Sequence, residues 1–136
     1  MNREELRRYI MEEYHAENDF PWLRYPENEV FRHPGNRKWF ALIMEVTGDR
    51  LGLPDQEKHA VVNLKCDPLP IGSLRAEPGF FPAYHMNKAS WITAALDGSI
   101  PDDKLKMLLE MASVTLLMDS HIPFIMAHLL KHLIVM

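Results

Sequence analysis

The sequence contains little that would support a cross-linked, membrane-embedded or secreted protein. Cys66 is its only cysteine, so no disulfide can form within the chain, and a lone thiol is typical of reducing compartments. No stretch of 18 residues is both apolar and uncharged, which argues against a membrane-spanning helix. The first 15 residues carry charges throughout and lack the apolar run of a signal peptide. We therefore expect a cytoplasmic protein with no membrane partner.

An excess of positive charge is also missing. The chain has 15 Lys and Arg against 19 Asp and Glu, a net charge of −4. This balance argues against a protein that coats nucleic acid by bulk electrostatics, because phosphate contacts need clustered cations. The negative charge lies at the two ends, since residues 28–91 contain eight basic and seven acidic residues. A local cluster of cations in this nearly neutral middle remains compatible with the composition.

The length of 136 residues allows one domain with a sizeable core. We expect this single α+β domain to span residues 1–118. The apolar tail, residues 119–136, is expected to be helical and to dock into a groove of the core or onto a neighbouring subunit. The oligomeric state stays open, with self-association through the tail as one possibility.

Three segments are predicted to be helical. Asn2 and Glu5 have the spacing of a capping box, and an apolar stripe at helical spacing follows, which predicts a helix over residues 3–16. A short helix is expected over residues 69–77. Pro101 followed by Asp102 and Asp103 is typical of a helix start, and apolar residues continue this helix to Leu116.

The strand signals are strongest in the middle of the chain. Residues 29–33 and 38–46 flank the turn sequence Pro34-Gly35-Asn36 and predict a hairpin. Its second strand is expected to place four apolar side chains on one face: Phe40, Leu42, Met44 and Val46. Residues 59–66 alternate, which predicts one packed face and one wet face. The packed side chains would be Ala60, Val62, Leu64 and Cys66, and the wet ones His59, Val61, Asn63 and Lys65.

Two further extended segments follow, over residues 80–86 and 90–96. Asn87 and Lys88 lie at the reversal between them, and Asp97-Gly98 is a turn signal. Strands joined by short connections favour an antiparallel sheet. The predicted fold is therefore α+β, with a sheet of about five strands packed with an N-terminal and a C-terminal helix.

Three runs of sequence resemble the MmcQ/YjbR family of small bacterial proteins: YPENEVFRHPGNRKWFALI, VVNLKCDP and PGFFPAYHMNKASWITAALDGSIP. The resemblance implies an α+β fold of the kind compared with frataxin-like and secretion-chaperone-like architectures. It also implies a DNA-binding role through paired hairpin wings, and no established enzymatic activity. The sequence departs from the family pattern in its last helix, where Ala112-Ser113-Val114 stands in place of the usual Ser-Tyr pair.

The polar cluster near residue 85 has two interpretations. In an extended segment, His85 and Asn87 would point to one side and form a ligand pocket with Trp91 as an aromatic wall. Alternatively, Asn87 and Lys88 shape a turn and His85 bonds to neighbouring backbone. Because no nucleophile or carboxylate stands beside them in the sequence, the structural interpretation is favoured, and no catalytic residue is predicted.

Candidate contacts to nucleic acid come from five basic residues: Arg32, Arg37, Lys38, Lys65 and Lys88. If the 29–46 hairpin is a wing, Arg37 and Lys38 would reach phosphates. The alternative is that all five are ordinary solvated strand ends, with nearby carboxylates diluting the field.

No metal or other cofactor is expected. His128 and His132 are four residues apart, but the intervening residues lack the glutamate of a zinc-protease helix. Cys66 has no second cysteine as partner and is expected to be a buried, inert thiol. The sequence thus leads to the hypothesis of a non-enzymatic binding protein with double-stranded DNA as its partner. The alternative is a small-molecule or peptide-binding module around His85, Asn87 and Trp91.

Overall fold

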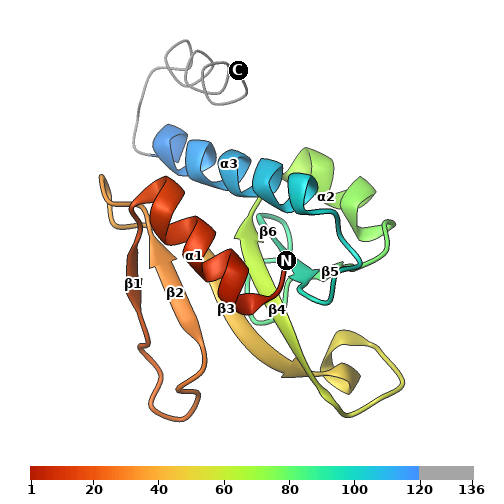
Figure 1. Ribbon diagram of the computed structural model, residues 1–136. Helices are drawn as coiled ribbons and strands as arrows, with labels where there is room; N and C mark the ends of the chain where they lie inside the picture. The colour runs from red at the N-terminus through yellow and green to blue at the C-terminus, as the bar shows by residue number, and fades with distance from the viewer. Residues whose placement is uncertain (120–136) are drawn as a thin grey trace.

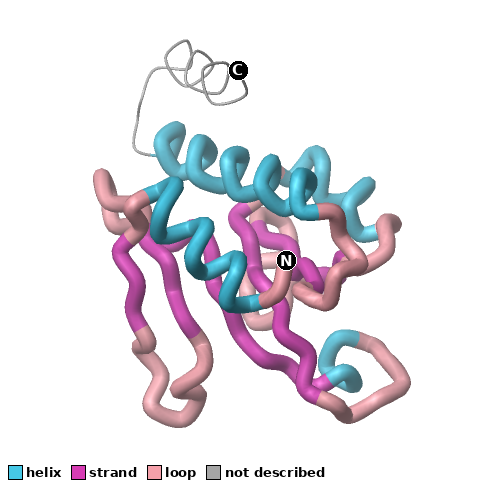
Figure 2. The backbone as a smooth tube through the Cα atoms, in the orientation of Figure 1, coloured by secondary structure: helices cyan, strands magenta, loops and turns pink. Residues whose placement is uncertain are grey.

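The computed structural model describes residues 1–119, with side chains up to Val114, and consists of a six-stranded antiparallel sheet and three α-helices (Figures 1 and 2). The strands lie in the order β1–β2–β3–β4–β6–β5. This confirms the predicted α+β class, with six strands in place of about five. The elements are α1 (Arg3–Tyr14), β1 (Glu17–Asp19), β2 (Glu29–Arg32), β3 (Trp39–Thr47), the 3₁₀ helix η1 (Gly48–Leu51), β4 (Lys58–Lys65), α2 (Pro68–Arg75), β5 (Phe80–Pro82), β6 (Trp91–Ala95) and α3 (Asp102–Asp119).

The additional strand is β1, which pairs with β2 at one edge of the sheet. Residues 17–28 are predicted to be irregular, because Pro21 and Pro26 break regular structure there. Glu17, Asn18 and Asp19 are all exposed in the structure. Their strand conformation comes from backbone pairing with β2, in the register Glu17 opposite Arg32 and Asp19 opposite Val30, which side-chain patterns do not reveal.

All three helices pack on one face of the sheet, where the larger core lies (Figure 1). Leu6 and Ile10 of α1 and Leu105 and Leu109 of α3 are almost completely inaccessible to solvent. They meet a layer of strand side chains that includes Phe31, Ile43, Val62, Leu64 and Ile92. Burial of this apolar layer is the main stabilising contribution that the sheet and the helices share.

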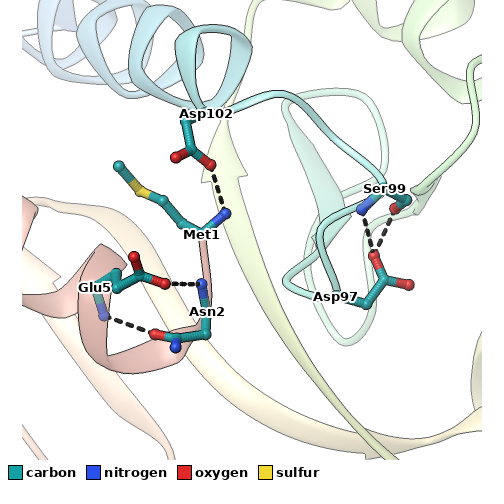
Figure 3. A network of polar contacts seen from close by, with 6 residues as sticks. All are labelled: Met1, Asn2, Glu5, Asp97, Ser99 and Asp102. Atoms are coloured by element: carbon teal, nitrogen blue, oxygen red, sulfur yellow. Dashed lines mark hydrogen bonds and ion pairs between the residues drawn. The ribbon is translucent and has the colours of Figure 1, made fainter.

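The start of α1 confirms the predicted capping box. The Asn2 side chain accepts a hydrogen bond from the Glu5 backbone N–H at 2.9 Å, and the Glu5 carboxylate accepts one from the Asn2 N–H at 3.1 Å. Figure 3 shows this pair beside the ammonium group of Met1, which lies 2.6 Å from Oδ1 of Asp102. The beginning of α1 is thereby connected to the beginning of α3. The same view shows Asp97 accepting from Ser99 in the predicted turn.

The prediction that Phe40 shares a face of β3 with Leu42, Met44 and Val46 is wrong. The pairing of β2 with β3 shifts between Phe31, which lies opposite Ala41, and Arg32, which lies opposite Trp39. Phe40 is therefore an extra residue, a β-bulge that reverses the alternation locally. Its side chain joins the helix-side core, whereas Leu42, Met44 and Val46 lie together on the opposite face as predicted.

The opposite face of the sheet is a second, smaller core and not a wet surface. The prediction for β4 is right for Val62, Leu64 and Cys66, which join the helix-side core. It is wrong for Val61 and Asn63, which are both fully buried. Loops cover this face instead of helices, since Trp22, Leu51 and Tyr84 pack against its strand residues. A covering made by loops leaves no periodic signal in the sequence.

The extended segment predicted over residues 80–86 ends early, at Pro82. Residues 84–86 form a bend, and His85 has a left-handed backbone conformation with φ of 58°. In the turn of the 29–46 hairpin, Gly35 and Asn36 are the residues expected to adopt a left-handed conformation. The residue with positive φ is instead Arg37, at 61°. The tail beyond residue 119, with His128 and His132, lies outside the described residues.

Glu29 is a carboxylate buried at the junction of α1, β1 and β2. Only 1% of it is exposed, and Nε of Arg7 lies 3.0 Å from both of its oxygens. Nδ2 of Asn18 donates a further hydrogen bond at 2.9 Å. Because a buried charge is costly without such donors, these contacts define how α1 sits against the edge of the sheet.

We predict that Arg7→Met lowers the free energy of unfolding by about 1–3 kcal/mol, since it leaves a buried carboxylate with fewer donors while retaining the apolar stem. Arg8→Met is the matched control, because Arg8 is an exposed neighbour on the same helix. Urea denaturation measures both variants. Equal losses in the two would show that the Glu29 contact does not contribute specifically.

Candidate functional site

All five basic residues that are predicted to contact DNA lie at the same end of the sheet. Arg32 ends β2, Arg37 and Lys38 lie in the turn to β3, and Lys65 ends β4. Lys65 pairs with Trp91, the first residue of β6, and Lys88 is in the turn just before it. We call these five residues the basic end. Antiparallel pairing brings them together, because β2 and β4 end where β3 and β6 begin.

The turn of the hairpin is held by its own hydrogen bonds. The backbone N–H of His33 donates to the carbonyl of Lys38 at 2.8 Å, and that of Arg37 donates to the carbonyl of His33 at 2.7 Å. Oδ1 of Asn36 accepts from the N–H of Lys38. Arg37 and Lys38 are exposed on this ordered turn.

Two cations of the basic end lie over tryptophan rings. The guanidinium of Arg32 is 5.8 Å from the ring centre of Trp39, and Nζ of Lys65 is 5.8 Å from that of Trp91. Such contacts orient the cation through the negative face of the ring. Trp91, predicted as a wall of the ligand pocket, is 7% exposed and is instead a partner of Lys65.

The carboxylates of β1 reduce the positive field of this end. Oδ2 of Asp19 lies 3.4 Å from Nη2 of Arg32, and Oε2 of Glu17 lies 3.3 Å from Nε of Arg37. The pair of Glu17 and Arg37 is exposed, whereas only 19% of the Arg32 side chain is exposed. An exposed pair contributes only about 0–1 kcal/mol, so the Glu17–Arg37 pair can be replaced at small cost.

A buried polar network lies on the loop-covered face of the sheet. Nδ2 of Asn63 donates to the carbonyl of Tyr84 at 2.8 Å, and the Thr93 hydroxyl donates to Oδ1 of Asn63 at 2.5 Å. The Tyr84 backbone N–H donates to the Thr93 oxygen at 3.0 Å. Both polar groups of the Tyr84 backbone are thus satisfied by side chains of β4 and β6. This attaches the loop of residues 83–86 to the sheet.

Beside this loop is a cavity of about 290 Å³. It lies over β3, where the segment before β2 and the loop after β5 meet. Its polar and aromatic lining comes from Trp22, Tyr25, Asn28, Glu45, Tyr84 and His85, and its apolar lining from Leu42, Met44 and Met86. A mostly apolar cavity with a few polar groups is the usual form of a small-molecule site.

The predicted pocket residues are only partly brought together. His85 lines the cavity, and its ring lies against that of Tyr84 with 4.0 Å between centroids. Asn87 closes the turn before β6, where its Oδ1 accepts from the N–H of Ala89 and its carbonyl accepts from the N–H of Ser90. Neither Asn87 nor Trp91 is among the residues that line the cavity.

Sequence reasoning did not identify the aromatic residues of this cavity. Trp22 and Tyr25 read as isolated apolar residues between two prolines, and Tyr84 read as part of a strand. One signal was present, namely three aromatic residues at positions 20–25 without helical or alternating spacing. Aromatic residues in a segment of irregular structure are frequent in binding sites.

The thiol of Cys66 is inaccessible, as predicted, with 3% of the residue exposed. Burial and, to a smaller extent, the negative charge of the neighbouring Asp67 together raise its pKa to about 11. The reactive thiolate is therefore scarce near neutral pH. Among residues 1–119, no group of His, Cys, Asp and Glu side chains is arranged to hold a metal ion, and none of the helices there combines the length and apolarity of a membrane span.

We predict that Thr93→Val lowers the free energy of unfolding by about 2 kcal/mol. The change preserves the shape of the side chain but leaves Oδ1 of Asn63 and the Tyr84 N–H without a partner. Thr47→Val is the control, because Thr47 is a partly exposed residue at the end of β3. Chemical denaturation gives both values, and a loss under 0.5 kcal/mol for Thr93→Val would contradict the role of the network.

A second expectation concerns Cys66. In the native protein at pH 8, a disulfide reagent such as dithionitrobenzoate should react at least ten times more slowly than in 8 M urea, since burial and the raised pKa both suppress the thiolate. Absorbance of the released thiol follows the reaction. Equal rates in the two conditions would mean that the thiol is accessible in the folded state.

Several known proteins share this fold and much of this sequence. The crystal structure of a protein from Pseudomonas syringae is 39% identical, with a TM-score of 0.80, and the match covers 82% of this chain and 96% of that one. A Deinococcus radiodurans protein with a DUF419 domain is 26% identical, with a TM-score of 0.66 and coverage of 95% and 87%.

Sequence comparison leads to the same group. The Bacillus subtilis protein YyaQ, which carries the description uncharacterised, is 36% identical over 110 residues, or 81% of this chain and 93% of its own length. None of these relatives carries the name of an enzyme. The model of the YjbR family matches residues 3–112, and the chain therefore belongs to the YjbR family.

Proposed function

We propose that the protein is a non-enzymatic DNA-binding protein that contacts the phosphate backbone through its basic end. The observation that supports this proposal is the convergence of Arg32, Arg37, Lys38, Lys65 and Lys88, which are up to 56 positions apart in the sequence, at one end of the sheet. Phosphate contacts supply most of the affinity in non-specific DNA binding. Clustering matters more for such contacts than the net charge of −4.

The arrangement favours backbone contact over base reading. The hairpin turn is short, and its cations are exposed on a hydrogen-bonded loop. Phosphate contacts position a protein on the duplex, whereas base-edge contacts specify sequence. We therefore expect strongly salt-dependent binding with little dependence on DNA sequence.

The test is a fluorescence anisotropy titration with a labelled duplex at low and moderate salt. If all five cations contact phosphates, the logarithm of the binding constant should fall against the logarithm of salt concentration with a slope of about −4.5. Arg37→Ala with Lys38→Ala should weaken binding and reduce this slope by about 2. Glu17→Gln should strengthen binding, because it removes the carboxylate that competes for Arg37.

The matched control is Arg24→Ala with Lys58→Ala, which removes the same charge. Both residues are exposed and line a hollow beside Val46 and Thr47, at the other end of β3. This pair should affect binding much less. An equal loss in the two double variants, or no binding at tens of micromolar protein in low salt, would rule out the basic end as a DNA site.

A further inference from the structure

Tyr84 lies between two adjoining cavities, both with apolar walls, of which the second also contains two cationic side chains. The first is the cavity of about 290 Å³ with aromatic and apolar lining described above. The second, of about 410 Å³, is lined by residues that include Arg50, Phe81, His85 and Lys88. Tyr84 and His85 line both. We propose that the two cavities form one binding site for a small molecule with a planar, apolar body and an anionic group.

The first cavity is suited to the planar body. Rings of Trp22, Tyr25 and Tyr84 line it, together with Leu42 and Met44 from the sheet. Aromatic walls favour flat ligands, which stack on them or meet their edges. Its volume is at the lower limit of known ligand pockets, which points to a ligand body of one or two rings.

Asn28 indicates that the planar body carries a hydrogen-bond donor. Asn28 lines the first cavity, and its Oδ1 is buried without a hydrogen-bond partner. Most buried side-chain acceptors have a donor, and an orphaned one is costly. A ring N–H or hydroxyl on the ligand, reached by a small rotation of the Asn28 amide, would satisfy this oxygen.

The second cavity is suited to the anion. Arg50 and Lys88 line it with His85, and none of its lining residues carries a carboxylate. Nη1 of Arg50 donates to the Tyr84 hydroxyl at 2.9 Å. This bond holds the guanidinium at the boundary between the two cavities, where its other N–H groups can pair with a carboxylate or phosphate.

The boundary itself is fixed before any ligand arrives. Asn63 and Thr93 bind the backbone of Tyr84 from the sheet. His85 next to it has a left-handed backbone, which non-glycine residues seldom adopt, and its ring lies tilted against that of Tyr84, with 45° between the ring planes. Uncommon backbone conformations gather at binding and catalytic sites. A pre-formed wall of this kind lowers the ordering cost of binding.

Indole-3-acetate is the probe, since it combines a two-ring plane, an N–H donor and a carboxylate. Titration followed by ¹H–¹⁵N NMR should show saturable shifts at Tyr84, His85 and the Asn28 side-chain amide. Tryptamine, with a cation in place of the anion, should bind at least ten times more weakly. 1-Methylindole-3-acetate, without the donor, should bind about five to ten times more weakly.

Two variants assign the binding to this site. Arg50→Gln should weaken indole-3-acetate binding at least tenfold, whereas Arg8→Gln, the matched control on an exposed arginine of α1, should leave it unchanged. Tyr25→Ala, at a half-exposed ring, should weaken it as well. Thermal melting confirms that each variant is folded.

The two proposed sites share Lys88, so variants at residues that belong to one site alone separate this proposal from DNA binding. Arg37→Ala with Lys38→Ala should leave indole-3-acetate binding intact, and Arg50→Gln should leave DNA binding intact. Indoxyl phosphate replaces the carboxylate by a phosphate and tests whether the anion can be either. The proposal is overturned if neither probe gives saturable shifts up to 5 mM, if tryptamine binds as well as indole-3-acetate, or if Arg50→Gln and Arg8→Gln behave alike.

Discussion

The structure depends on one constraint: both faces of the sheet are buried, but the three α-helices cover only one of them. On the second face the covering comes from loops, and loop backbone carries polar groups that must find partners once they are buried. Asn63 and Thr93 provide these partners for Tyr84. Their bonds place an aromatic ring over the sheet, close the smaller core, and define the wall that separates the two cavities. The same pair of side chains therefore serves both stability and the geometry of the candidate ligand site.

Charge is organised by the direction of the strands. Because neighbouring strands are antiparallel throughout the sheet, residues from the ends of β2 and β4 and the beginnings of β3 and β6 meet, and five cations come together without any cluster in the sequence. The edge strand β1 adds two carboxylates to the same end. The basic end is thus partly neutralised by its ion pairs with β1. The buried Glu29 binds both Arg7 of α1 and Asn18 of β1. The position of β1 is therefore tied to that of the helix.

Much of the fold could be predicted because its signals are local. The capping box at Asn2 and Glu5, the hairpin over residues 29–46 and the turn at Asp97-Gly98 all appear as expected. The errors share a different cause. Phe40 faces the helices because β3 has a bulge opposite β2. The strand conformation of β1 comes from its backbone pairing with β2. Asn63 is buried because a loop 21 residues further along the chain covers it. Each of these depends on a contact with a distant segment, which periodicity along one segment cannot report.

The same division applies to the candidate sites. The sequence by itself determined the α+β class, the order of the main elements, the burial of Cys66 and the identity of the cations that now form the basic end, because residue type and spacing decide these features locally. Only the tertiary structure decided which of those cations are neighbours, which carboxylates oppose them, and that His85 lines a cavity with Trp22 and Tyr25 instead of with Trp91. The physical reason is that a cavity or a charged surface is formed by side chains from segments brought together by strand pairing and core packing, and those contacts exist only in the folded chain.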